Sequence, residues 1–484
     1  MDVKNYEGTR WAIVMGKYEG IEKYAVNELY KVIQQYVPYV LTVNNDNIES
    51  QKLNEYNVIF IGTSTTNSYI AQFVNKGIIK PNMKKEEYTI KICQSTFNTE
   101  REMIILTGAD ENGVLYAVRD FEHYYSDSSR YLGEQYYNAY KPFIEKMPEY
   151  EVNSSPAVEN RGLWTWGHVI YDYKRYLDNM SKWKMNIITI WNDFAPLNAK
   201  DVVDYAHSRG IKVVWGFSWC WGEKVNPTDE KELEKWSDRV ISTYEEQYAG
   251  LGGDGIYFQT FTETKDTLID GISIAELVTN WVNHITGKLL EKHPDLWVQF
   301  GLHATSVKNE FETIRKIDPR INITWEDAGS FPFFYDAKET GQFPETYGFT
   351  SKISELRGKD EDFGVVLKGL TVLNWTAFEH QKGAFILGES NDMFRRDRTQ
   401  DKLFFWRYAQ AYWIKNIKYT LDIIKMIASK DIKKLSVMAL VEDGMWEEHL
   451  WYPVALYAES LWNPYEEVDE LVKKVSLSKD AYFA

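Results

Sequence analysis

The strongest constraint on the fold is a change of pattern after Pro156, where short apolar segments begin to alternate with amphipathic helical segments. The alternation continues over roughly 300 residues, enough for one large barrel domain. We interpret the apolar segments as eight strands, at 161–166, 187–191, 213–219, 255–260, 297–302, 321–325, 367–375 and 436–441. Eight strands separated by helices are typical of a (β/α)8 TIM barrel, an α/β fold. The sequence therefore predicts a barrel at 157–484, with a helical insertion near 400–429.

Residues 1–150 have a different pattern. They contain three apolar runs between two helical patterns, at 21–36, 57–62, 88–93, 103–107 and 114–125. Strands flanked by helices favour a small α+β domain. The motif Asn-Ser-Ser-Pro at 153–156 is typical of a linker, so we predict that this domain precedes the barrel as a separate unit.

The charge of the chain disfavours some classes of partner. Its 484 residues include 55 basic and 71 acidic side chains, a formal net charge of −16. Nucleic acids and anionic membrane surfaces are bound through clustered Lys and Arg, and the sequence has no such cluster, so we expect neither partner. No run approaches the roughly 20 apolar residues of a membrane span, and residues 1–8 contain no apolar signal core. We predict a cytoplasmic protein, with a removed signal peptide as the alternative.

Motifs of several other chemistries are absent from the sequence. Cys93 and Cys220 lie far apart and form neither a CxxC motif nor a metal-binding spacing. The sequence also lacks the GxSxG, Walker-type, GxGxxG and HExxH motifs in the contexts that they require. We therefore expect no metal, no disulfide framework and no phosphate or dinucleotide site.

Tryptophan and carboxylate residues gather where the predicted barrel strands end. The chain contains 18 Trp and 33 Tyr, and a large aromatic core is the alternative explanation for many of them. The loops after the strands form the active site of a TIM barrel. Five or more strand ends carry a tryptophan, a carboxylate or both. The candidate residues at the strand ends are Trp164, Trp166, Trp191, Asn192, Asp193, Trp219, Trp221, Glu263, His303, Trp325, Glu326, Asp327, Asn374, Trp375 and Glu379.

This combination is what glycoside hydrolysis requires, because one carboxylic acid protonates the leaving oxygen while a second carboxylate activates water or attacks the sugar. We predict Glu263 as the acid, since it follows the apolar strand in a Phe-flanked setting where burial would keep it protonated. Glu326 and Asp327 are adjacent, so only one is expected to face the sugar. We favour Asp327 as the base and Glu326 as the second choice.

Each of these residues also has a structural interpretation. Glu263 could cap the following helix or form a salt bridge, and the pair Glu326 and Asp327 could be a solvated Glu beside a loop-capping Asp. Asp193 could bind sugar hydroxyls or cap the next helix. His303 could bind a hydroxyl or be a satisfied structural histidine.

Several motifs resemble those of carbohydrate-active enzymes. Residues 61–64 and 107–117 are similar to the hexosaminidase-like N-terminal domain of α-glucuronidases and β-N-acetylhexosaminidases. Residues 160–163 resemble the first-strand motif of hexosaminidases, which implies that Arg161 binds sugar hydroxyls. Residues 180–191 and 202–214 resemble the second and third barrel units of the same enzymes. The resemblance covers nearly the whole chain and implies a catalytic barrel.

The two families differ at the end of the fourth strand. β-N-Acetylhexosaminidases carry an Asp-Glu pair there, whereas this chain has Thr262 before Glu263, which matches the acid and lacks its Asp partner. α-Glucuronidases place a lone Glu in a similar context and use carboxylates from later strands, and Glu263 with Asp327 resembles that inverting arrangement. Residues 452–471 also look like the end of the α-glucuronidase barrel.

The sequence thus favours an exo-acting, α-glucuronidase-like glycoside hydrolase whose substrate is an oligosaccharide or glycoside. No cofactor is expected, because carboxylates alone can meet the charge of an oxocarbenium-like transition state. The substrate-binding residues would be Arg161, Trp166, Trp191, Asn192, Asp193, Trp219, His303, Trp325 and Trp375. A β-N-acetylhexosaminidase-like enzyme and a barrel that binds carbohydrate without cleaving it are the alternatives. The Tyr-rich segment 124–140 favours a homodimer, with ordinary exposed rings as the alternative.

Overall fold

The computed structural model describes residues 10–34, 42–81, 84–125, 149–220, 223–264, 266–303, 306–307, 309–326, 343–370, 381–432, 434–441, 445–448, 452–478 and 481. The chain divides into two compact units, each with its own core. The first unit comprises Met1–Pro156 and Ser476–Asp480, and the second comprises Ala157–Val475 and Ala481–Ala484. Within the described residues, no helix combines the length and the apolar character that a membrane crossing needs.

The first unit is built on a six-stranded sheet with the order β2-β1-β3-β5-β4-β6. Its strands are β1 (Trp11–Met15), β2 (Thr42–Asn45), β3 (Asn57–Gly62), β4 (Tyr88–Gln94), β5 (Glu102–Gly108) and β6 (Tyr150–Ser154). The first four strands of that order are parallel, and β4 runs antiparallel to both of its neighbours. The central strands β3 and β5 are buried at every residue, as expected for strands covered on both faces.

Among the described residues, three α-helices accompany this sheet, namely α1 (Gly20–Gln34), α2 (Ser68–Asn75) and α3 (Glu111–Asp120). Local capping explains where two of them begin. The side chain of Asn67 accepts hydrogen bonds from Tyr69 N and Ile70 N in the first turn of α2, and Asp110 accepts one from Gly113 N at the start of α3. The prediction that 103–107 and 114–125 form a strand followed by a helix is confirmed, although α3 begins earlier and continues as a π-turn at Phe121–Tyr125.

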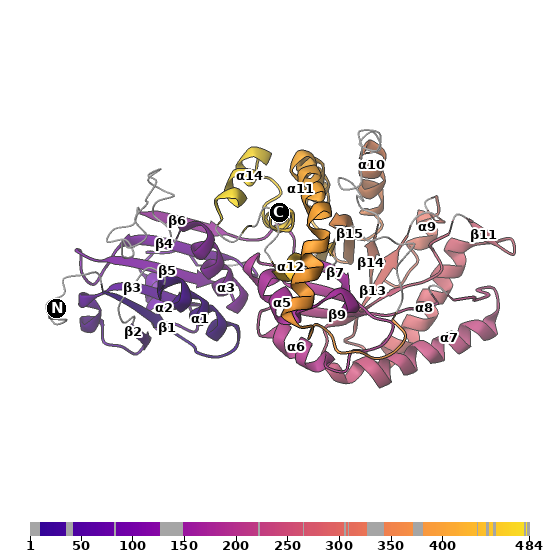
Figure 1. Cartoon of the computed structure of the whole chain (residues 1–484), viewed down its shortest axis with the longest axis horizontal. Coiled ribbons are helices and arrows are strands. Elements are labelled where there is room, and N and C mark those ends of the chain that lie inside the picture. The colour runs from indigo at the N-terminus through magenta and orange to yellow at the C-terminus, as the bar shows by residue number, and fades with distance from the viewer. Residues whose placement is uncertain are drawn as a thin grey trace. The chain divides into compact units, whose positions relative to one another are not determined.

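The second unit contains a closed barrel of eight parallel strands, which confirms the predicted fold (Figure 1). The order around the barrel is β10-β13-β14-β15-β16-β7-β8-β9. The strands are β7 (Asn160–Trp166), β8 (Ile187–Trp191), β9 (Lys212–Gly216), β10 (Gly255–Gln259), β13 (Trp297–Leu302), β14 (Ile321–Trp325), β15 (Asp362–Leu370) and β16 (Lys434–Val441). The predicted seventh strand at 367–375 was placed too late, because the buried apolar run that pairs with β14 starts at Phe363.

Helices follow the strands around the barrel (Figure 1). They are α5 (Tyr173–Lys182), α6 (Ala199–His207), α7 (Glu230–Thr243), α8 (Ile274–Lys292), α9 (Phe311–Ile314), α10 (Phe343–Ile353), α11 (Asp392–Ala428), α12 (Met445–Glu448), α13 (Tyr452–Trp462) and α14 (Val468–Leu477). A short hairpin of β11 (Leu268–Ile269) and β12 (Ile272–Ser273) precedes α8. The long α11 lies between β15 and β16, where a regular barrel has its seventh helix, so it is part of the repeat and not an insertion.

Two separate apolar clusters show which strand residues face inward. One cluster packs strand side chains against the helices. The other consists of alternating strand residues inside the barrel, mainly Trp164, Trp166, Ile187, Trp191, Val214, Tyr257, Val366, Met438 and Leu440. The interior is therefore filled with side chains, and a substrate can reach the strands only at a rim.

Candidate active site

Glu326 lies at the centre of a polar cluster at the C-terminal ends of the strands. It directly follows β14 and is only 4% exposed. The hydroxyl of Tyr257 and the side-chain amide of Gln259 both donate hydrogen bonds to Glu326 Oε1. His303 Nε2 lies 2.7 Å from Glu326 Oε2. A buried carboxylate is costly without partners, and three donors here satisfy both of its oxygens.

Strand alternation and register explain why these side chains meet. Tyr257 and Gln259 are two residues apart on β10, so they point to the same face of the strand. β10 pairs with β13, and β13 pairs with β14, which places the ends of the three strands side by side. The backbone N–H of Glu326 also donates to Leu302 O at 3.2 Å, which fixes the start of the loop after β14.

Gly301 on β13 provides the space in which the cluster forms. A Cβ atom at this position would lie 2.2 Å from Glu326 Oε1 and 2.3 Å from the hydroxyl oxygen of Tyr257. Real Cβ atoms do not approach other atoms so closely, so a larger residue would push the two side chains apart. The contact between Tyr257 and Glu326 therefore depends on a glycine in the neighbouring strand.

Aromatic rings from the first two barrel strands lie beside this cluster. Trp164 packs edge-on against Trp166 at 4.7 Å and is stacked with Trp191 at 6.1 Å between ring centroids. Tyr257 contacts both Trp164 and Trp191, at 5.9 and 6.3 Å. Tyr257 thus contacts these tryptophan rings and also belongs to the polar cluster around Glu326.

Asn192 lies at the same rim, directly after β8. It is 2% exposed, and its amide donates to Ile190 O at 3.3 Å. Its Oδ1 atom is buried and has no hydrogen-bond partner among the described residues. Such an acceptor is suited to a hydroxyl group of a ligand. The neighbouring Asp193 is half-buried and accepts a hydrogen bond from Gln381 N at 3.1 Å.

Glu263 lies in the loop after β10, and its side chain is exposed. The apolar surroundings that the sequence suggested are not observed, because Phe261 packs against Trp281 of α8 instead, with ring centroids 5.5 Å apart. Strand β10 therefore supplies two donors to Glu326 and then carries Glu263 at the surface. Asp327 and Trp375, together with Trp221, Asn374 and Glu379, lie outside the described residues.

Three of the predicted sugar-binding residues are not brought to this cluster. Trp219 stacks on Phe258 at 3.6 Å, and Trp325 packs against Phe349 of α10 at 5.0 Å, so both face the helices. Arg161 is buried near the start of β7, and its guanidinium donates to the backbone carbonyls of Val158, Glu159 and Lys184. These contacts give Arg161 a structural role at the opposite end of the strand.

Two contributors to the cluster, Tyr257 and Gln259, were not singled out from the sequence. Their spacing in the sequence could have indicated them, since two residues with polar groups alternate within an otherwise apolar strand.

A further buried carboxyl, Glu447 on α12, was also missed. Its Oε1 accepts from Tyr171 N at 2.8 Å, and its Oε2 has no partner in the described part of the chain. Burial raises the pKa of Glu447 to about 8, against the opposing effect of the Tyr171 hydrogen bond.

No family model and no curated protein matches this sequence. Solved structures do resemble it. CpGH84D aligns with a TM-score of 0.46 at 14% identity, over 74% of this chain and 57% of that protein. A β-N-acetylhexosaminidase from Bacteroides fragilis aligns with a TM-score of 0.51 at 12% identity, over 97% of this chain and 90% of that protein.

A third structure is BtGH115A, a 4-O-methyl-α-glucuronidase with specificity for decorated arabinogalactans. It aligns with a TM-score of 0.52 at 14% identity, over 97% of this chain and 59% of that protein. This chain therefore spans less than two thirds of the length of BtGH115A and of CpGH84D. The resemblance to α-glucuronidases and β-N-acetylhexosaminidases that the motifs indicated is confirmed at the level of the fold.

Proposed function

We propose that this protein is a glycoside hydrolase that removes a terminal sugar from an oligosaccharide or glycoside. The observation that carries this proposal is the buried carboxylate of Glu326, which is held by Tyr257, Gln259 and His303 at the C-terminal ends of the barrel strands. TIM-barrel enzymes place their chemistry at that end. Glycoside hydrolysis needs a carboxylate in a fixed position close to aromatic surfaces, and both features are present here.

The three donors hold the carboxyl group of Glu326 in a fixed position. An ionised carboxylate can take a proton from an attacking water in an inverting enzyme, or attack the anomeric carbon in a retaining one. In both cases its charge offsets the positive charge that develops on the sugar ring. We therefore assign this role to Glu326, with the adjacent Asp327 as the alternative.

Glu263 is our candidate for the acid that protonates the leaving oxygen. It follows the strand that supplies two of the donors to Glu326, and its exposed side chain is accessible to a substrate. A catalytic acid need not touch its final partners before substrate binds. Trp166 and Trp191 would form the aromatic wall, and the unpartnered Oδ1 of Asn192 would accept a hydrogen bond from a sugar hydroxyl.

The substrate class that we propose first is a terminal uronic acid. The likeness to BtGH115A supports it, together with a lone Glu at the end of the fourth barrel strand. The likeness to the Bacteroides fragilis enzyme supports a β-N-acetylhexosaminidase-like activity as the second candidate. The absence of an Asp before Glu263 argues against the second candidate, since that Asp orients the acetamido group in the enzymes that this chain resembles.

A panel of aryl glycosides tests the proposal. We expect hydrolysis of at least one 4-nitrophenyl glycoside, with the α-glucuronide and β-N-acetylglucosaminide as the first probes. Glu263→Gln should slow substrates with poor leaving groups more than those with good ones, because good leaving groups need less protonation. Glu276→Gln changes an exposed Glu on α8 and serves as the control. Equal rates for Glu263→Gln and wild type on poor leaving groups would exclude Glu263 as the acid.

The alternative from another class is a barrel that binds carbohydrate without cleaving it. The exposed position of Glu263 is the observation that favours this alternative. Calorimetric binding of a glycan together with no turnover of any aryl glycoside would establish it and overturn the enzymatic proposal.

A further inference from the structure

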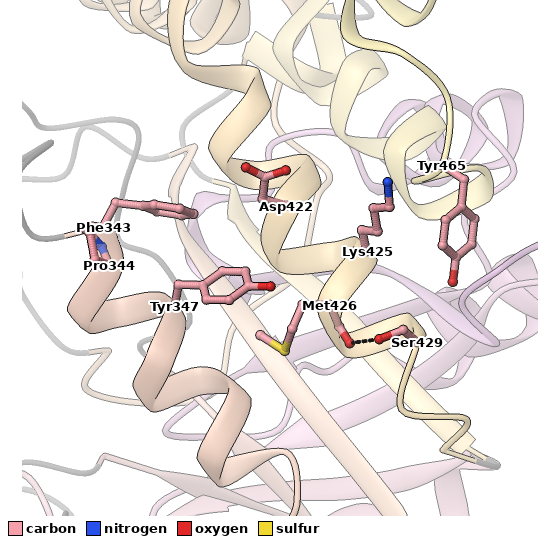
Figure 2. A pocket seen from close by; sticks show the side chains of 8 residues that line it. All are labelled: Phe343, Pro344, Tyr347, Asp422, Lys425, Met426, Ser429 and Tyr465. Atoms are coloured by element: carbon pink, nitrogen blue, oxygen red, sulfur yellow. Dashed lines mark hydrogen bonds between the residues drawn. The ribbon is translucent and has the colours of Figure 1, made fainter.

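A surface groove of about 720 Å³ lies in the barrel unit, and none of its lining residues belongs to the Glu326 cluster (Figure 2). It is lined by side chains of α10, of the C-terminal part of α11 and of the segment after α13. Lys425 lies near the end of α11, and β16 begins shortly afterwards at Lys434. Phe343 and Tyr347 lie in the first turns of α10, which follows β14, so the groove is formed by the helices that precede and follow β15 in the chain.

Aromatic rings stand on both sides of this groove. Figure 2 shows Phe343 and Tyr347 of α10 on one side of α11 and Tyr465 on the other. Tyr465 is 52% exposed, and the ammonium group of Lys425 lies over its ring, 5.8 Å from the centroid. Phe343 is fixed by Tyr419, with ring centroids 4.6 Å apart. Exposed tyrosine rings offer a flat apolar face and a polar edge, which suits the apolar face of a sugar ring.

The floor of the groove combines hydrogen-bond donors and acceptors. Asp422, Lys425 and Ser429 are spaced by three and four residues along α11, so they share one face of the helix. The hydroxyl of Ser429 donates to Met426 O at 2.7 Å, and its oxygen can still accept (Figure 2). A carboxylate, an ammonium group and a hydroxyl side by side match the mixed donors and acceptors of sugar hydroxyls.

The groove continues into a second hollow of about 340 Å³, which shares Asp422, Lys425 and Tyr465 with it. Its charged residues are mainly acidic, because Lys418 and Lys425 face Asp422, Glu466, Glu467 and Asp469. An acidic excess disfavours a polyanion.

We propose that this groove is a second carbohydrate-binding site, which holds a neutral segment of an oligosaccharide chain by stacking on Tyr465 and Tyr347. The choice of a carbohydrate as ligand rests on the proposed function. A glycosidase with such a site would hold a polymeric substrate at a second point on the barrel unit, and this would raise the effective concentration of chain ends at the catalytic rim.

Binding measurements on the full-length chain test this proposal. Glu326→Gln is used as the background so that the probes are not hydrolysed, and the probes are xylohexaose, cellohexaose and debranched arabinogalactan. We expect at least one probe to bind, and Tyr465→Ala to weaken its binding by about fivefold or more in isothermal titration calorimetry. Tyr18→Ala changes an equally exposed tyrosine in the first unit and should leave the affinity unchanged.

Lys425→Gln provides a second variant, in case Tyr465→Ala lowers the thermal midpoint. Its affinity for the same probe should also fall. The proposal is overturned if no neutral probe binds, if both groove variants bind as tightly as the background, or if Tyr465→Ala weakens the binding of polygalacturonate more than that of every neutral probe. Failure of all aryl glycosides in the separate activity assay would remove the proposed function, while the calorimetry would still report on the groove.

Discussion

The two rims of the barrel each bury a carboxylate, but they surround it with different partners. At the N-terminal rim, Glu459 on α13 is bound by Lys184 and by Lys474. Burial alone would raise the pKa of Glu459, but the charges of the two lysines outweigh it and hold the pKa at about 2. At the C-terminal rim, Glu326 is bound by a tyrosine, an amide and a histidine.

We attribute a structural role to Glu459, and we propose a reactive role for Glu326. Lys184 holds an unusual left-handed backbone conformation, with φ of 57°, immediately before β8, and its ammonium group also lies over the ring of Trp462 at 5.1 Å. Two permanent cations fix the charge of Glu459, so this group cannot exchange a proton near neutral pH. The donors on Glu326 hold its carboxyl group in position without a lysine or arginine among the contacts described.

The largest effect is expected from a substitution of Glu326 at the C-terminal rim. Glu326→Gln keeps the size of the side chain but removes the negative charge, so hydrolysis of the best aryl glycoside should fall about 10²- to 10⁴-fold. The thermal midpoint should change much less than the activity. Activity within about threefold of wild type would show that another carboxylate, with Asp327 as the first candidate, performs this role.

Lys184→Met tests the contribution of the Lys184–Glu459 ion pair to stability at the N-terminal rim. The substitution leaves Glu459 buried beside a single lysine, so we expect a loss of about 3–5 kcal/mol in the free energy of unfolding. Chemical denaturation measures it. Lys474 is 28% exposed, and Lys474→Met should cost less. The double variant Lys184→Met with Glu459→Gln should recover part of the loss, and no recovery would argue against the ion pair as the cause.

The ion pairs of Glu459 should also make the stability of the protein depend on pH. The pKa of Glu459 in the folded chain is about 2, below its ordinary value of 4.5, so the folded state binds this proton less readily than the unfolded state. Its contribution of about 3 kcal/mol is present above pH 4.5 and is lost as the pH falls toward 2. Denaturation between pH 5 and pH 3 should therefore show a smaller slope in Glu459→Gln than in wild type. Equal slopes would contradict this assignment.

The smallest expected effect concerns the space at Gly301. Gly301→Ala should displace Glu326 and Tyr257 and lower the turnover of aryl glycosides about 10- to 100-fold, because small displacements at a reacting centre are costly. Gly287→Ala on α8 is the matched control, since a Cβ there would have no neighbour within 4 Å. Unchanged turnover in Gly301→Ala would show that the cluster can move aside without loss.

The barrel could be predicted from sequence because its strands are short, apolar and separated by clear helical patterns. The expected strands at 187–191, 297–302 and 321–325 have the same bounds as β8, β13 and β14. The seventh strand was harder to place, since apolar and small residues continue from Phe363 past the end of β15 and give no internal boundary. The strands β1 and β2 of the first unit were not recognised; β2 is a short, partly exposed edge strand that pairs with β1, and β1 pairs with β3.

The candidate site was only partly predictable, because a residue at a strand end belongs to it only if its side chain points toward the barrel interior and not toward the helices. Alternation predicts that Trp325 faces away from the interior if Glu326 faces toward it, and the structure has this arrangement. The direction of Trp219 could not be inferred in this way, since β9 ends earlier, at Gly216. The role of Gly301 depends on contacts across three strands, and no local pattern in the sequence indicates it.

Glu447 has a consequence for how the protein exchanges protons with its surroundings. Its carboxyl group has a pKa of about 8 in the folded chain and an ordinary value of 4.5 once exposed. At neutral pH the group is therefore mostly protonated when folded and ionised when unfolded, so opening of the chain releases a proton. The contribution of Glu447 to the stability of the fold therefore decreases as the pH rises from about 4.5 toward 8.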